Sequence, residues 1–162
     1  MKTIAISNRK GGVGKTTTAA ALGDVLADGG LSVLLVDLDS QGSLSLLTGV
    51  TGRGMAAALL DDEIGLADIV TEWRPNCWIA PAGKGLEDTE IALVNEIGRE
   101  NILKSMLAGL GFDVVILDCS PSMGVLTLNA LTAADGVLIP MRPSVLDLMG
   151  LGSQLETIGK IQ

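Results

Sequence analysis

One glycine-rich stretch constrains this chain more than any other feature. It reads KGGVGKTT over residues 10–17 and directly follows a short apolar run at residues 3–7. Glycines let the backbone turn tightly and bring its N–H groups up to an anion. Lys15 supplies a positive charge, and the hydroxyl of Thr16 can reach a magnesium ion. The stretch therefore predicts a phosphate-binding loop.

The residues on either side of this loop have the patterns of a strand and a helix. Residues 3–7 are rich in β-branched side chains, which favours a strand. From Gly14 onward, apolar residues recur three and four positions apart until Gly29 and Gly30. A helix that begins at the loop would direct its positive end at bound phosphates. These flanks disfavour the alternative, a glycine-rich turn with lysines placed by chance.

The loop departs from the strict P-loop pattern, G-x-x-x-x-G-K-[ST]. Arg9 stands where that pattern has its first glycine, and a second lysine, Lys10, stands beside the glycines. The stretch instead matches K-G-G-x-G-K-[ST]-[ST], the deviant Walker A box.

Length and composition predict a single α/β domain over residues 1–162, with a mostly parallel central sheet flanked by helices. The chain can bury one substantial core but is too short for two ordinary domains. Its hydrophobic fraction is 48% and its aromatic fraction is 2%. The core must therefore consist mainly of Val, Ile, Leu and Ala, which suits buried parallel strands between helices.

Charge and missing residue types exclude several functions. A net charge of −8 argues against a broad nucleic-acid-binding surface, although a small basic patch is compatible with it. The chain has no histidine, the commonest metal ligand and general base. Cys77 and Cys119 are far apart and predict reduced thiols, not a disulfide or zinc site. Without a signal-peptide core or membrane-spanning run, we expect a cytoplasmic protein with no membrane partner.

Further elements follow from apolar patterning along the chain. We expect strands at residues 31–36, 76–80, 112–118 and 137–140, and helices at 55–60, 66–70, 91–110 and 147–158. Gly98 is a possible break in the long helix. The acidic turn at residues 61–63 reads as solvated surface.

Two aspartates follow the predicted strand at residues 31–36. Ligands of open α/β sheets bind at the carboxyl ends of the strands. Alternation places Asp37 and Asp39 on the same side of an extended chain, so both could reach one site. The alternative is that Asp39 or Ser40 caps a following helix. The phosphate-binding loop upstream favours the functional interpretation.

Asp118 ends the apolar run at residues 112–118, which has the form of a Walker B strand. A buried strand with a polar exit is the alternative. Because the same chain carries a phosphate-binding loop, we expect the Asp118 carboxylate to serve magnesium.

The segment at residues 52–57 matches G-x-G-x-x-A, the dinucleotide fingerprint. We discount it because no predicted strand directly precedes it. Cys77 is likewise interpreted as a core residue, since nothing nearby would activate its thiol.

Taken together, these motifs resemble the ParA/MinD family of deviant Walker A ATPases, and the similarity runs along nearly the whole chain. Residues 10–17 match its Walker A box, residues 36–42 resemble its D-x-D-x-Q-G motif, and residues 113–121 resemble its Walker B strand and following loop. Residues 138–152 resemble its next strand and helix start. The resemblance implies a three-layer P-loop NTPase fold, here without the family's last strands and helices.

The resemblance also implies roles for individual residues, with ATP, ADP and Mg²⁺ as cofactors. Lys15 would contact the β- and γ-phosphates, Thr16 would ligate magnesium, and Thr17 would touch the α-phosphate. Asp39 would orient the attacking water, and Asp118 would hold magnesium through water. Lys10 would reach across a dimer to the partner's nucleotide. The remaining nucleotide-binding residues would be Gly11, Gly12, Val13 and Gly14, and Asp37 is a further candidate at the metal.

The implied function is a slowly hydrolysing ATPase that dimerises with ATP and acts in plasmid or chromosome segregation. A ParB-like centromere-binding protein would stimulate it. Nonspecific DNA binding, and with it nucleoid association, is weakened by the acidic charge and by the absence of the family's C-terminal segments. The alternatives are a MinD-like or cargo-positioning scaffold, an electron-transfer ATPase like the nitrogenase iron protein, and a hydrolytically dead remnant. The two cysteines do not match the iron-protein pattern.

Two positions depart from the family pattern. Ser120 stands where proline is frequent, and Arg142 stands where an uncharged polar residue is frequent. The C-terminal segments would supply adenine contacts, so we expect either a piece of a longer protein or a shortened form whose open sheet edge is covered by association.

Overall fold

A computed structural model describes residues 1–161, so the expected domain end at residue 162 lies outside the described residues. A six-stranded sheet forms its centre, in the order β3-β4-β2-β5-β1-β6. Neighbouring strands are parallel except for the antiparallel pair β3 and β4. The strands are β1 Lys2–Ile6, β2 Val33–Leu38, β3 Thr71–Arg74, β4 Cys77–Ala80, β5 Val114–Cys119 and β6 Gly136–Leu138. The predicted mostly parallel sheet is confirmed.

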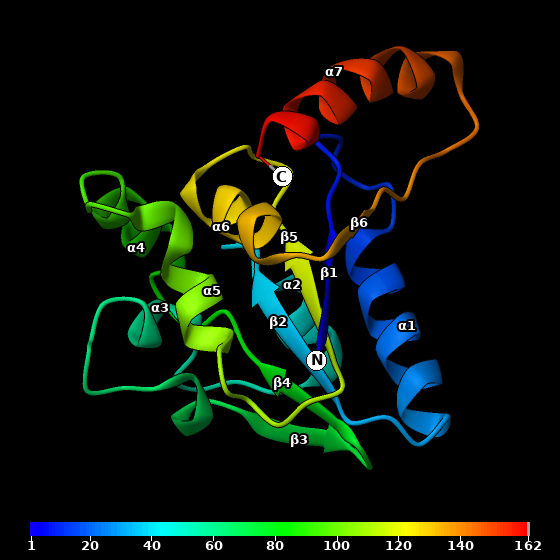
Figure 1. Cartoon of the computed structure of the whole chain (residues 1–162). Coiled ribbons are helices and arrows are strands. Elements are labelled where there is room, and N and C mark those ends of the chain that lie inside the picture. The colour runs from blue at the N-terminus through cyan, green and yellow to red at the C-terminus, as the bar shows by residue number, and fades with distance from the viewer. Residues whose placement is uncertain (162) are drawn as a thin grey trace.

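Helices cover both faces of this sheet (Figure 1). Along β2, Leu34 and Val36 join the core on one face, and Val33 and Leu35 join the core on the other. The second face packs against α1 and α2, and the first against α3 to α6. The three-layer α/β prediction is therefore confirmed. The helices are α1 Lys15–Asp28, α2 Ser43–Thr48, α3 Met55–Ala58, η1 Leu66–Asp68, α4 Leu86–Leu93, η2 Arg99–Asn101, α5 Ile102–Leu107, α6 Val125–Ala133 and α7 Val145–Ile161.

α7 lies across the end of the sheet toward which β1 and β5 run (Figure 1). The amide of Gln154 in this helix donates to the carbonyl oxygen of Ser7, 3.1 Å away, just after β1. The side chain of Asn8 donates to the carbonyl oxygen of Pro140 at 2.8 Å. These bonds join α7 and the chain leading into it to the start of the phosphate-binding loop.

The observed elements differ from the expected ones in three ways. The single helix expected at residues 91–110 is divided among α4, η2 and α5: α4 already ends at Leu93, and Gly98, left-handed with φ of 73°, is the residue before η2. Neither β3 nor α6 was expected. β2 extends to Leu38, so Asp37 lies inside the strand and not after it.

The segment with the G-x-G-x-x-A pattern is a contact between two loops. A Cβ atom on Gly54 would lie 2.2 Å from the carbonyl oxygen of Pro81. Just after Gly54, the backbone N–H of Met55 donates to that same oxygen at 2.7 Å. The element before the segment is α2, not a strand. Gly54 therefore permits a close backbone approach, and the interpretation that this is not a dinucleotide fingerprint is supported.

Candidate active site

The glycine-rich loop joins the end of β1 to the start of α1. Gly12 and Gly14 adopt left-handed conformations, with φ of 69° and 96°. Gly11 faces open space, since a Cβ atom there would meet nothing within 4 Å. No described side chain caps α1 at Gly14. The first N–H groups of a helix have no intrahelical partner, so this end of α1 can donate hydrogen bonds to an anion.

Lys15 places its ammonium group within this loop. The residue is 7% exposed, and its Nζ atom donates to the carbonyl oxygen of Lys10 at 3.4 Å. The side chain therefore folds back along the loop, so its ammonium group lies where the loop would bind a phosphate. Thr16 is half-buried and Thr17 is exposed in the first turn of α1.

Asp118 lies near this cradle with an unsatisfied carboxyl group. It is 1% exposed, and neither of its oxygens has a hydrogen-bond partner among the described residues. Burial is the main cause that raises the pKa of Asp118 to about 7. The nearby Thr16 hydroxyl and the Lys15 charge lower this pKa, while the charges of Asp37 and Asp39 raise it.

A divalent cation fits this environment because it would satisfy buried carboxyl oxygens that otherwise have no partner. The described part of the chain contains no group of three or more His, Cys, Asp or Glu side chains that could hold a metal by themselves. A cation at Asp118 would therefore need the Thr16 hydroxyl, water or phosphate oxygens as its other ligands.

Asp37 is the neighbour of Asp118 in the sheet, since β2 and β5 pair these two residues in register. Asp37 is fully buried, and its Oδ2 atom accepts hydrogen bonds from both the N–H and the hydroxyl of Ser45, at 2.8 and 2.6 Å. Its Oδ1 atom accepts the N–H of Asp39 at 3.2 Å. Burial raises the pKa of Asp37, and the bonds from Ser45 oppose this. A role for Asp37 as a metal ligand stays a prediction. Both of its carboxyl oxygens already accept hydrogen bonds from the protein.

Asp39 lies in the loop between β2 and α2 and is half-buried. Its Oδ1 atom accepts the N–H of Gln41 at 3.0 Å, which is an Asx-turn. Gly42, not Asp39 or Ser40, is the residue at the N-cap of α2. Neither Asp39 nor Ser40 therefore caps α2. The role of Asp39 in orienting the attacking water stays a prediction.

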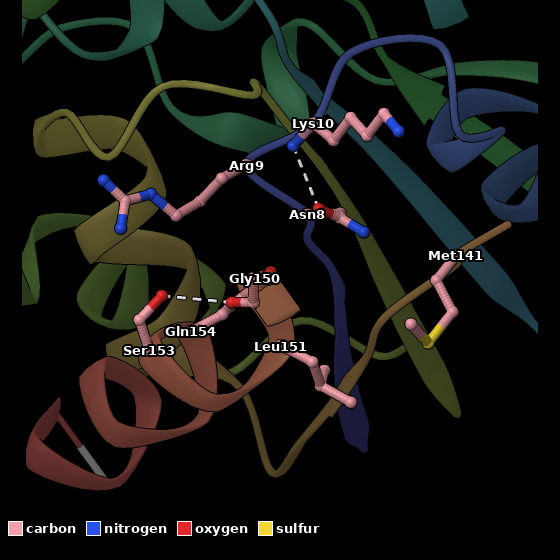
Figure 2. Close-up of a pocket in the computed structure, with 8 residues that line it drawn as sticks. All are labelled: Asn8, Arg9, Lys10, Met141, Gly150, Leu151, Ser153 and Gln154. Atoms are coloured by element: carbon pink, nitrogen blue, oxygen red, sulfur yellow. Dashed lines mark hydrogen bonds between the residues drawn. The ribbon is translucent and has the colours of Figure 1, made fainter. Parts of the chain in front are cut away.

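Lys10 lies beside a cavity of about 250 Å³ between the loop and α7 (Figure 2). The backbone N–H of Lys10 donates to the side-chain oxygen of Asn8 at 2.9 Å. Figure 2 shows the side chains of Arg9 and Lys10 extending in opposite directions from the loop. Both residues are exposed, so they can contact molecules outside this chain. The cavity is lined by Asn8, Arg9, Lys10, Met141, Gly150, Leu151, Ser153 and Gln154.

Comparisons with known proteins identify the family of this chain. A family model described as an AAA domain matches residues 1–162. The chain is 41% identical to the sporulation initiation inhibitor protein Soj of Bacillus subtilis, over 99% of the chain and 66% of that protein. It is 43% identical to the chromosome partitioning protein ParA of Myxococcus xanthus, over 98% of the chain and 58% of that protein. The chain belongs to the ParA/MinD family.

A solved structure with this fold was determined with nucleotide. The crystal structure of cobyrinic acid a,c-diamide synthase from Mycobacterium smegmatis, with a bound ATP analogue and magnesium, has a TM-score of 0.93 and 40% sequence identity. The match covers 100% of the present chain and 68% of that one. The chain spans 53% of the length of two uncharacterised Mycobacterium tuberculosis relatives that it also matches. No helix within residues 1–161 has the length and apolar character to cross a bilayer.

Two residues of this ParA/MinD-family chain contribute to the site although the sequence did not predict it. Arg142, noted only as a departure from the family pattern, donates from its Nη2 atom to the carbonyl oxygen of Gly12. Ser45 holds Asp37, as described above. Neither has a motif signal: Arg142 contacts a residue 130 positions away, and Ser45 reaches Asp37 only because α2 turns back toward β2. Cys77, by contrast, is buried as expected, and burial raises the pKa of its thiol to about 11.

Proposed function

We propose that the protein binds ATP with Mg²⁺ and hydrolyses it slowly, as a nucleotide-dependent dimerisation switch in the partition of plasmid or chromosomal DNA. The observation that carries this proposal is the unpartnered Asp118 carboxyl beside Lys15 and Thr16, at the open end of α1. The similarity to Soj and ParA proteins supports the partition role.

In this proposal each part of the site has one task. The loop N–H groups and Lys15 bind the phosphates, in keeping with the open start of α1. Thr16 and Asp118 would hold Mg²⁺, which when bound neutralises charge on the phosphates. Asp39 orients the attacking water, as the family resemblance implies. The half-buried position of Asp39 and its turn geometry are compatible with that task.

Steady-state phosphate release tests the enzymatic part. We expect Mg²⁺-dependent turnover of about 10⁻² s⁻¹ or slower, in the range of unstimulated P-loop NTPases. Asp39→Ala should lower this rate by about a hundredfold while leaving the Kd for ADP unchanged, because Asp39 acts on water and not on the nucleotide. Parental turnover in Asp39→Ala would contradict the assignment. Parental protein that neither binds nor hydrolyses ATP would leave only the dead-remnant alternative.

The dimer part of the proposal depends on Lys10, which would act on the partner's nucleotide as a positive charge placed near the transferring phosphoryl group. Its exposure supports contact outside its own chain. In sedimentation with Mg²⁺ and a non-hydrolysable ATP analogue, we expect parental protein to dimerise and Lys10→Ala to stay monomeric, with its affinity for ADP within about threefold of the parental value. Lys104→Ala, an exposed lysine on α5, is the matched control. An equally dimeric Lys10→Ala would refute the cross-dimer role.

A second candidate is a cytoplasmic scaffold that positions a protein cargo without acting on DNA. The net charge of −8 favours it, because nonspecific DNA binding depends on clustered Lys and Arg. An electrophoretic shift assay with ATP at low and high salt separates the two. Salt-sensitive DNA binding supports partition through the nucleoid, with a ParB-like protein as the stimulator, and no binding at low salt supports the scaffold.

A further inference from the structure

Asp37 and Asp118 are adjacent buried carboxyl groups with opposite surroundings. β2 and β5 pair them in register. The oxygens of Asp118 have no partner among the described residues, whereas both oxygens of Asp37 accept hydrogen bonds. A carboxylate whose oxygens already accept such bonds gains less from a metal ion than one without them. The two residues are therefore suited to different tasks.

Ser45 is the main partner of Asp37. Its N–H and its hydroxyl both donate to Oδ2, and hydrogen bonds to a charged acceptor are about twice as strong as neutral ones. The same hydroxyl oxygen accepts the backbone N–H of Ala82 at 3.0 Å. Ser45 is buried, so water cannot readily replace these bonds. One hydroxyl thus joins the end of β2, the start of α2 and the chain after β4.

The other oxygen of Asp37 holds the start of the Asp39 loop. Oδ1 accepts the N–H of Asp39. The loop then closes on itself, because the N–H of Gly42 donates to the carbonyl oxygen of Asp39 at 2.8 Å. One carboxyl group therefore fixes both ends of the segment between β2 and α2: it holds Asp39 at the start and Ser45 at the end.

We infer that Asp37 and Ser45 form a positioning pair that fixes the Asp39 loop for ATP hydrolysis, and that Asp37 is a positioning residue and not a metal ligand. The role toward hydrolysis rests on the proposed function. Positioning has large effects, since a misplacement of about 1 Å can lower a rate about a hundredfold. Ser45→Ala removes one donor from Asp37 and the acceptor of the Ala82 N–H. Asp37 keeps the backbone N–H of residue 45 as a donor but loses the hydroxyl, so the carboxyl that anchors the start of the loop is held less firmly, while the phosphate-binding loop is untouched.

Backbone amide exchange in the nucleotide-free protein, followed residue by residue by NMR, tests the geometry without any ATP. We expect the Asp39 amide to exchange about tenfold faster in Ser45→Ala and in Asp37→Asn, because in both variants the group that accepts its hydrogen bond is held less firmly. Thr48→Ala is the matched control: the Thr48 hydroxyl donates within α2 to the carbonyl oxygens of Leu44 and Ser45, but it does not contact Asp37 or the Ser45 hydroxyl. Equal exchange in parent, Ser45→Ala and Asp37→Asn overturns the inference.

Kinetics then separate positioning from a general structural role. Ser45→Ala should lower kcat about tenfold with KM within about twofold, and Ser45→Thr, which keeps the hydroxyl, should recover at least about half of the parental kcat. A parental kcat in Ser45→Ala overturns the inference even if exchange is faster. Joint loss of kcat, nucleotide affinity and Tm without recovery by Ser45→Thr also overturns it. If the parent itself does not hydrolyse ATP, the proposed function fails, and the exchange data alone decide whether the pair holds the loop.

Discussion

Lys15→Ala is expected to weaken the binding of ATP and ADP by at least about a hundredfold, since a charge-assisted hydrogen bond to phosphate contributes about 3 kcal/mol. In the free protein the Lys15 ammonium lies along the loop, with the carbonyl oxygen of Lys10 as its acceptor. It is largely shielded from solvent. The charge is therefore already placed where a phosphate would bind, and alanine removes it without adding bulk.

Titration calorimetry with ADP and Mg²⁺ measures this loss directly. Lys104→Ala again serves as the matched control, because Lys104 is an exposed lysine on α5. Tm should change little in Lys15→Ala without nucleotide, and the stabilisation that nucleotide gives the parent should disappear. Parental affinity in Lys15→Ala would show that residues 10–17 are not the phosphate-binding site.

The parts of the site that could be predicted from sequence are those encoded locally. The phosphate-binding loop needs glycines and a lysine at fixed spacing, and Asp118 ends an unbroken apolar run. Ser45 could not be found this way. Its importance depends on α2 bringing a hydroxyl back to the end of β2, eight residues after Asp37. Arg142 reaches the loop from 130 positions away, so no local pattern marks it.

The errors in the predicted elements have similar causes. α6 is buried on nearly all sides, so its sequence lacks the polar stripe that marks a surface helix. β3 is a short, mostly exposed edge strand without alternation. α5 begins where the side chain of Asn129 in α6 accepts the N–H of Leu103 at 3.0 Å and donates to the carbonyl oxygen of Arg99. A tertiary contact therefore fixes the start of α5. The apolar pattern along the sequence does not mark this position, so the predicted helix ran across it.

Asp118→Asn is expected to stabilise the metal-free protein at pH 8 and to abolish the proposed Mg²⁺-dependent nucleotide hydrolysis. The Asp118 pKa is raised from its ordinary value of 3.8 to about 7, chiefly by burial. Between these two values the folded protein holds a proton that the unfolded chain has lost. The stability that this group contributes is therefore full below about pH 4, falls steadily between pH 4 and 7, and is constant above pH 7. Asparagine does not titrate, so the Asp118→Asn variant does not lose this stability as the pH rises.

Urea unfolding with EDTA between pH 5 and pH 8 measures the effect. We expect the parent to lose about 2 to 4 kcal/mol of unfolding free energy relative to Asp118→Asn over this range. Asp113→Asn is the control carboxylate, because Asp113 is exposed and hydrogen bonds to Ser32 lower its pKa. Its own stability change should fall in acid, near and below pH 4, outside the measured range. A parent and an Asp118→Asn variant with the same pH dependence would contradict the perturbed pKa.

The same measurement with Mg²⁺ and ADP distinguishes a metal site from an ordinary buried acid. Ligands that bind only the folded state stabilise it, and a cation requires the deprotonated carboxylate. Mg²⁺ with ADP should therefore restore more stability to the parent at pH 8 than at pH 5, and should restore less to Asp118→Asn at either pH. If Asp118 were only a buried acid, the nucleotide would stabilise both proteins equally. The instability of the free carboxylate would then have no function, whereas in the proposed site it is what makes this position selective for a cation.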